Sequence, residues 1–121
     1  MRLLVLSLVL AAAATSAAAE SRQVIGYAGQ LGEWELIAEV NDASGGEFSG
    51  LATMTHVGIC TQDGPEQKSG DIRLRISASR LNATLSLTGV ECTYIATFSD
   101  AYKGLLSCPG MPAQPLTLWV R

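Results

Sequence analysis

The sequence is poor in the residues and motifs that catalysis uses most. It has one histidine, His56, among 121 residues, so at most one imidazole is present for base catalysis. Residues 46–50 contain glycines and a serine, but not in the G-x-S-x-G order of a nucleophile elbow. Zincin, P-loop and dinucleotide-binding motifs are also absent. The sequence therefore predicts a protein that is not an enzyme, and we assign it no catalytic residue and no cofactor.

Positive charge is also scarce. Eight Lys and Arg residues against eleven Asp and Glu residues give a net charge of −3, and loss of Arg2 changes the count to 7 minus 11, or −4. Nucleic acids and anionic membranes attract basic proteins, so we expect neither as a partner. No apolar stretch after residue 19 is long enough to span a bilayer, so we expect no membrane anchor.

The first nineteen residues have the three-part order of a secretion signal. Arg2 supplies a positive charge, residues 3–14 are apolar, and residues 15–19 are small. The apolar run would span only about 18 Å as a helix, against a hydrocarbon core of about 30 Å. We expect cleavage before Glu20, which leaves residues 20–121 as a single domain in the periplasm or the medium. A eukaryotic secretory route is also compatible with this pattern.

Beyond residue 34, apolar side chains recur at every second position, which is typical of strands with one buried face. The expected strands are residues 34–40, 48–54, 72–78, 81–87, 92–98, 102–108 and 116–120, and residues 23–27 can supply an eighth. The chemistry of residues 41–46 predicts a turn, and no segment requires a helix. We therefore predict an all-β fold, a small antiparallel up-and-down β-barrel or a sandwich, of seven to eight strands.

One predicted connection is unusually long. Residues 57–70 contain two runs of turn residues, Asp63-Gly64-Pro65 and Lys68-Ser69-Gly70. Loops of this length are often functional. The alternative is a packed surface loop that is held in place by Cys60.

Three cysteines fall at the same end of the predicted meander. In an oxidising compartment we expect one disulfide and one remaining thiol. Cys92 and Cys108 are symmetric about Asp100, so a hairpin turn centred there would place them opposite each other. A slip of register would instead pair Cys60 with one of them. A free Cys60 would suit a mixed disulfide with a partner.

A metal site is the alternative to the disulfide. Cys60, Cys92, Cys108 and His56 together form a Cys3His set, which zinc accepts. However, structural zinc ligands are usually paired two to four residues apart, whereas 31 and 15 residues separate these cysteines. We therefore predict no metal ion.

Short stretches resemble known β-barrel families. Gly32-Glu33-Trp34 resembles the G-x-W start of the calycins, the lipocalins and avidins, and residues 46–50 resemble avidin's second hairpin. Residues 28–36 are similar to the opening of small periplasmic inhibitors of bacterial metalloproteases, which are eight-stranded barrels with a disulfide. That resemblance implies that the new N-terminal segment, Glu20, Ser21, Arg22, Gln23 and Val24, enters a protease cleft. The lipocalin resemblance implies that Arg121 packs against Trp34.

The size of the barrel helps to choose among these families. Eight strands of about seven residues enclose an interior that side chains just fill. We therefore expect a non-enzymatic exported binding protein, a protease inhibitor or an envelope interaction module, whose partner is another exported or envelope protein such as a protease. The first alternative is a calycin-type carrier of a small apolar ligand. The second is a small enzyme that uses Cys60.

Overall fold

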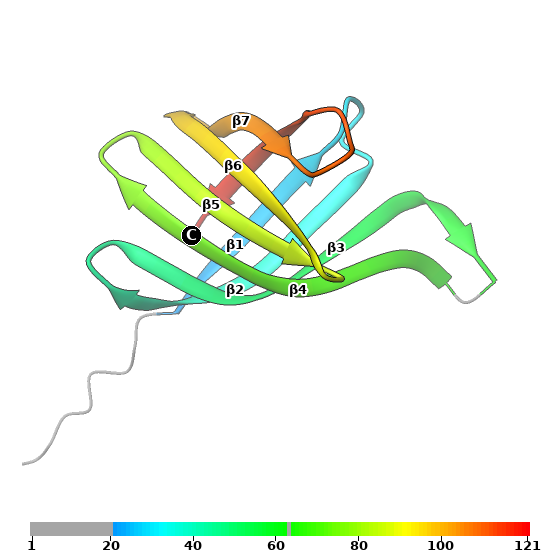
Figure 1. Ribbon diagram of the computed structural model, residues 1–121, viewed down its shortest axis with the longest axis horizontal. Helices are drawn as coiled ribbons and strands as arrows, with labels where there is room; N and C mark the ends of the chain where they lie inside the picture. The colour runs from blue at the N-terminus through cyan, green and yellow to red at the C-terminus, as the bar shows by residue number, and fades with distance from the viewer. Residues whose placement is uncertain (1–20, 63) are drawn as a thin grey trace, which may run out of the picture.

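The chain folds into a closed antiparallel barrel of eight strands connected in sequence order (Figure 1). The computed structural model describes residues 21–62 and 64–121, so the expected signal peptide and Glu20 lie outside the described residues. The strands are β1 Ser21–Ala28, β2 Trp34–Ser44, β3 Glu47–Thr61, β4 Gly64–Ser77, β5 Arg80–Leu87, β6 Val90–Ser99, β7 Ala101–Ser107 and β8 Gln114–Val120. The predicted all-β barrel is confirmed, and the described part of the chain contains no helix.

Alternation along each strand separates the core from the outer wall. In β2, Leu36, Ala38 and Val40 are buried, whereas Ile37 and Glu39 face outward. The same period of two continues around the barrel and places buried apolar side chains from all eight strands in one cluster. The core is therefore the barrel interior, as the pattern predicts.

Tyr94 of β6 is among the largest side chains that are fully buried in that interior. Its side chain is 1% exposed. Its hydroxyl donates a hydrogen bond to the Leu116 carbonyl at 2.6 Å and lies 3.2 Å from the Tyr102 carbonyl oxygen. A phenol in this position occupies the space that a ligand-holding barrel leaves open.

Two glycines allow neighbouring strands to approach closely in the curved wall. A Cβ atom on Gly50 would lie 1.9 Å from the Glu39 carbonyl oxygen, and one on Gly70 would lie 1.7 Å from the Ser86 carbonyl oxygen. No other residue fits such contacts without moving backbone. Both glycines interrupt a run of inward apolar residues, where glycine favours the curvature that closes a small barrel.

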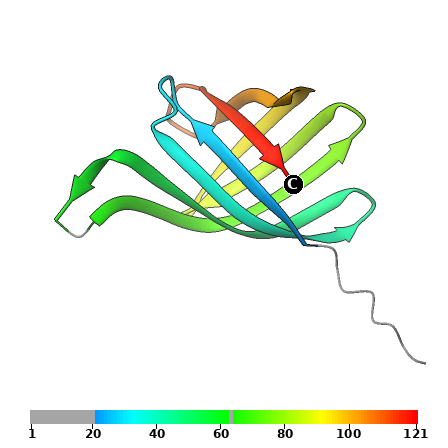
Figure 2. The same cartoon turned by 180° about the vertical axis from the view of Figure 1, so that it is seen from behind.

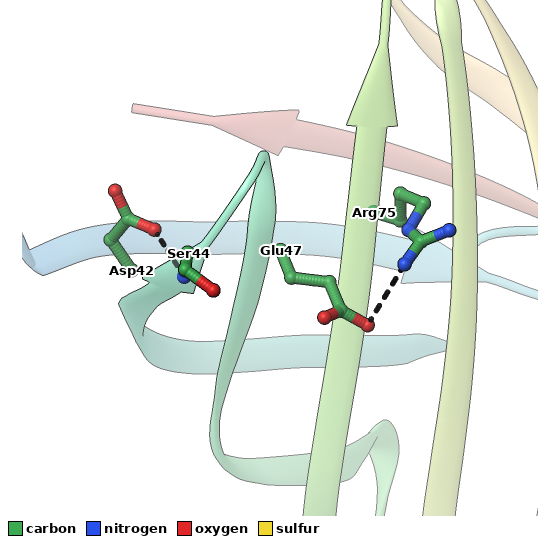
Figure 3. A network of polar contacts seen from close by, with 4 residues as sticks. All are labelled: Asp42, Ser44, Glu47 and Arg75. Atoms are coloured by element: carbon green, nitrogen blue, oxygen red, sulfur yellow. Dashed lines mark hydrogen bonds and ion pairs between the residues drawn. The ribbon is translucent and has the colours of Figure 1, made fainter.

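The connection between β2 and β3 is tighter than the sequence predicts. The expected turn over residues 41–46 is too long, because β2 continues to Ser44 and only Gly45 and Gly46 turn the chain. The Ser44 amide donates to Asp42 at 2.9 Å (Figure 3). Beyond the turn, Glu47 lies 3.6 Å from Arg75 on β4. Both of these side chains are exposed enough for this ion pair to contribute little to stability.

Strands β1 and β8 close the barrel, as Figure 2 shows from behind. Residues 24–28 pair with residues 116–120. Gln23 and Arg121 extend the pairing through reciprocal backbone hydrogen bonds of 3.2 and 2.9 Å. The eighth strand that the sequence allowed is therefore present.

Candidate functional site

A two-stranded arm projects from one end of the barrel. Strand β2 pairs with β3 only as far as His56, and β5 pairs with β4 only as far as Gly70. The last backbone contacts with the barrel are a hydrogen bond from Val57 to Glu33 and one from Thr88 to Ser69. Residues 58–62 and 64–67, which we call the arm, continue beyond these contacts and clear the barrel in Figures 1 and 2.

The arm replaces the long loop expected over residues 57–70, so that prediction is wrong. Residues up to Thr61 belong to β3, and residues from Gly64 belong to β4. Cys60 pairs with Pro65 and Thr61 with Gly64, beyond a register shift that begins at Thr55. The alternation of apolar residues that predicts the other strands marks only strands with one face on a core, so it does not reveal strands that leave the barrel.

The side chains of Trp34, His56 and Lys68 meet at the end of the barrel that carries the arm, which we call the mouth. The Lys68 ammonium lies 5.1 Å from the centre of the Trp34 ring, and the His56 ring lies 4.4 Å from the same indole. The Nδ1 atom of His56 is buried and has no hydrogen-bond partner among the described residues. The sequence predicts a loop over residues 57–70, so it does not identify Lys68 as a member of this cluster.

An apolar pocket of about 120 Å³ opens beside this cluster. Trp34, Met54, Leu87, Val90 and Met111 line it, together with the disulfide. Lys68 is the one charged residue among the described residues that line it. A dry cavity of about 150 Å³ holds one benzene molecule, so this pocket has room for a single apolar side chain.

The disulfide holds one rim of the pocket. Cys92 and Cys108 are bonded, with their Cα atoms 4.3 Å apart. Thr93 pairs with Ser107, and the hairpin turns at Asp100, as the symmetric spacing predicts. The Met111 amide bonds back to the Cys108 carbonyl at 3.3 Å, so the bridge also positions Met111 at the pocket. Cys60 lies on the arm strand and is the remaining cysteine of the chain.

Glu33 stabilises the turn that leads into Trp34. Its carboxylate accepts a hydrogen bond from the Leu31 amide at 3.0 Å. Backbone hydrogen bonds from Glu33 itself and from Leu31 hold the pKa of this carboxyl below its ordinary value, and the nearby His56 lowers it further. The negative charge therefore persists at mildly acidic pH, close to the histidine ring.

The expected N-terminal binding segment lies at the opposite end of the barrel from the arm. Ser21, Arg22, Gln23 and Val24 all belong to β1 and pair with β2, rather than forming a free segment. Val24 is fully buried, and the Arg22 guanidinium lies 5.3 Å from the centre of the Phe48 ring. The binding role of this segment stays a prediction, and only its outward side chains are placed to serve it.

In residues 21–62 and 64–121, no group of three or more His, Cys, Asp and Glu side chains is arranged to hold a metal ion. The same part of the chain has no helix that is long and apolar enough to cross a membrane.

Comparisons with models of protein families, with curated proteins and with solved structures found no match to this chain.

Proposed function

We propose that this chain is an exported, non-enzymatic binding protein that captures a segment of another exported protein at the arm end of the barrel. The observation that carries the proposal is the arm standing directly beside the pocket and Lys68. A disulfide is compatible with export. The partner class remains that expected from the sequence, an envelope protein or a protease.

The backbone of the arm supports recognition by strand addition. Its two strands pair with each other, and neither has a further strand neighbour among the described residues. Exposed strand edges offer backbone hydrogen bonds to an extended segment of a partner. Pro65 and the exposed Glu66 lie along the β4 edge and oppose indiscriminate pairing with other chains.

The pocket supports selectivity for one kind of side chain. Its volume admits a single apolar group, and the Lys68 ammonium favours a carboxylate next to it. We therefore propose that the captured segment is extended and carries an apolar side chain close to an acidic group.

The carrier alternative has less support. The barrel interior is occupied by Tyr94 and its neighbours. A hollow of about 540 Å³ on the outer wall is open and lined mainly by outward-facing residues such as Ser49, Arg73 and Thr84. An apolar ligand of ordinary size needs an enclosed site of roughly 300 Å³ or more.

The test is capture from the periplasmic or extracellular fraction of the host by three immobilised proteins. One is the mature chain. The second replaces residues 57–66 by Asn-Gly, which leaves His56-Asn-Gly as a three-residue hairpin connection. The third lacks residues 20–23. We expect the first and third to retain the same partner, and the armless chain to lose it while keeping the barrel and the disulfide.

Single substitutions refine the test. Lys68→Gln should weaken capture, whereas Arg80→Gln, a matched loss of charge on the outer wall of β5, should not. Capture that survives removal of the arm but fails without residues 20–23 would favour the N-terminal segment and refute our proposal.

A further inference from the structure

The outer wall formed by β2, β1, β8 and β7 carries an apolar row where solvent-facing residues are usually polar. Ile25 pairs with Ile37 on one side and with Trp119 on the other. Ile37 is 46% exposed and Trp119 is 38% exposed. The Tyr27 ring, 41% exposed, meets the Trp119 indole edge to face, with ring centres 6.1 Å apart. Contiguous exposed apolar groups of this kind mark interaction surfaces.

Charged residues flank the apolar row in an ordered way. On one side, the register places Glu35, Tyr27, Thr117 and Lys103 next to one another in that order. On the other side it places Glu39, Gln23 and Arg121 in order. Both flanking rows are therefore acidic at β2 and basic at β7 or β8. Among the described residues, neither Glu35 nor Lys103 forms an ion pair.

We propose that this face, which we call the β1 face, binds a second copy of the chain in a two-fold symmetric dimer whose axis runs parallel to β1. Rotation about such an axis brings the acidic side of one copy over the basic side of the other. Glu39 then faces Arg121 of the second copy. Glu35 faces Thr117, and Lys103 of the second copy lies on the next strand, one spacing of about 5 Å away and within reach of its long side chain. Ile37 packs on Trp119, and Ile25 packs on its own equivalent.

The charges also exclude the other two-fold arrangement. An axis across the strands would place Glu35 against Glu39 of the second copy, and Lys103 one strand spacing, about 5 Å, from Arg121. Like charges in contact disfavour that orientation. The β1 face is therefore complementary to itself in one orientation only. Because it spans four strands, it belongs with the smaller interfaces, and we expect a reversible dimer whose population depends on concentration.

Within one copy, Glu35 and Lys103 are too far apart to attract each other strongly. Three strand spacings separate them, or roughly 14 Å, whereas charges in water are screened beyond about 8 Å at physiological ionic strength. Compensation between substitutions at these two positions would therefore report a contact between copies.

The experiment is sedimentation equilibrium of the mature protein over a range of concentrations, with Glu35→Lys, Lys103→Glu and the double variant. Each single reversal makes two contacts repulsive, so we expect it to raise the dimer Kd by about tenfold or more. The double variant exchanges the charges and should return the Kd close to that of the wild type. Glu91→Lys and Arg80→Glu make the same charge changes on the outer walls of β6 and β5, and should leave the Kd unchanged.

Three results would overturn the proposal: a chain that is monomeric at about 1 mM, a dimer that the single reversals do not weaken, or a double variant as weak as the singles. A dimer that disappears in Cys60→Ser would be a disulfide-linked species and would also overturn it. Because the β1 face and the arm are separate surfaces, loss of partner capture in the armless chain would leave this dimer intact.

Discussion

Tyr94 shows how one residue decides what the barrel can hold. Its position on β6 is inward by the period of two, and its side chain is buried in the core. Burial of a hydroxyl is costly unless it forms a hydrogen bond. The Leu116 carbonyl at 2.6 Å supplies that bond and ties β6 to β8 through the interior. A polar group can therefore fill the core without destabilising it.

Removal of this hydroxyl should destabilise the fold measurably. Tyr94→Phe removes the hydrogen bond to the Leu116 carbonyl, and we expect the free energy of unfolding to fall by about 1 kcal/mol or more. Urea unfolding followed by circular dichroism measures the change. Tyr27→Phe on the outer wall is the matched control and should stay within about 0.5 kcal/mol of the wild type. An equal cost for the two variants would contradict the role of the hydrogen bond.

Tyr94 also predicts how stability changes in alkali. Burial raises the pKa of Tyr94 above its ordinary value of 10. Above that value the unfolded chain loses the phenolic proton while the folded chain keeps it, so stability falls as the pH rises. The slope approaches about 1.4 kcal/mol per pH unit. Urea unfolding at about pH 9 and about pH 11, in a Cys60→Ser background, should show this loss, and Tyr94→Phe should lack it.

Lys68 marks the limit of residue-level prediction from the sequence. The inward positions of Trp34 and His56 follow from strand alternation, because their neighbours in the chain are buried at every second position. Lys68 stands on the same inner side, paired with Met54. Because it lies between turn residues in the sequence, only the pairing of β3 with β4 identifies it as part of the mouth.

At the scale of elements, the hairpin of β6 and β7 was the most predictable. Cys92 and Cys108 are equidistant from Asp100, and one turn at that residue fixes the register of both strands. The arm was the least predictable, because register is specified only where one face is buried. Sequence patterns therefore recovered the strands within the barrel wall and failed where two strands leave it.

The Cys92–Cys108 disulfide should contribute substantially to stability. Cys92 and Cys108 are 16 residues apart, and closing a loop of this length is worth roughly 3 kcal/mol through the entropy of the unfolded chain. The double variant Cys92→Ser/Cys108→Ser should lose about that amount in urea unfolding. Cys60→Ser should lose much less. If instead Cys60→Ser is the damaging change and peptide mapping finds Cys60 in a bridge, the observed pairing does not form in solution.

At the scale of the whole molecule, the two ends of the described chain lie together, and the elements with proposed functions are separated. Gln23 and Arg121 are hydrogen-bonded to each other, so the barrel closes next to both ends of the described chain. The arm lies at the opposite end, and the β1 face lies on the wall between them. The chain can therefore be cut and rejoined without altering the pairing of the eight strands.

Two circular permutants use this arrangement to test the arm independently of the barrel. Both join residue 121 to residue 21 by a short Gly/Ser linker, which is tolerated where chain ends are close. One opens between Gly45 and Gly46, in an exposed turn, and the other opens after Gln62 at the tip of the arm. Both should refold to the same barrel with the Cys92–Cys108 bond, as circular dichroism and thiol counting would show.

New chain ends fray, so only the permutant that opens at Gly45 should capture the partner at full strength. Equal capture by both would show that a continuous arm is not needed, and recognition would then have to depend on the mouth pocket and Lys68 alone.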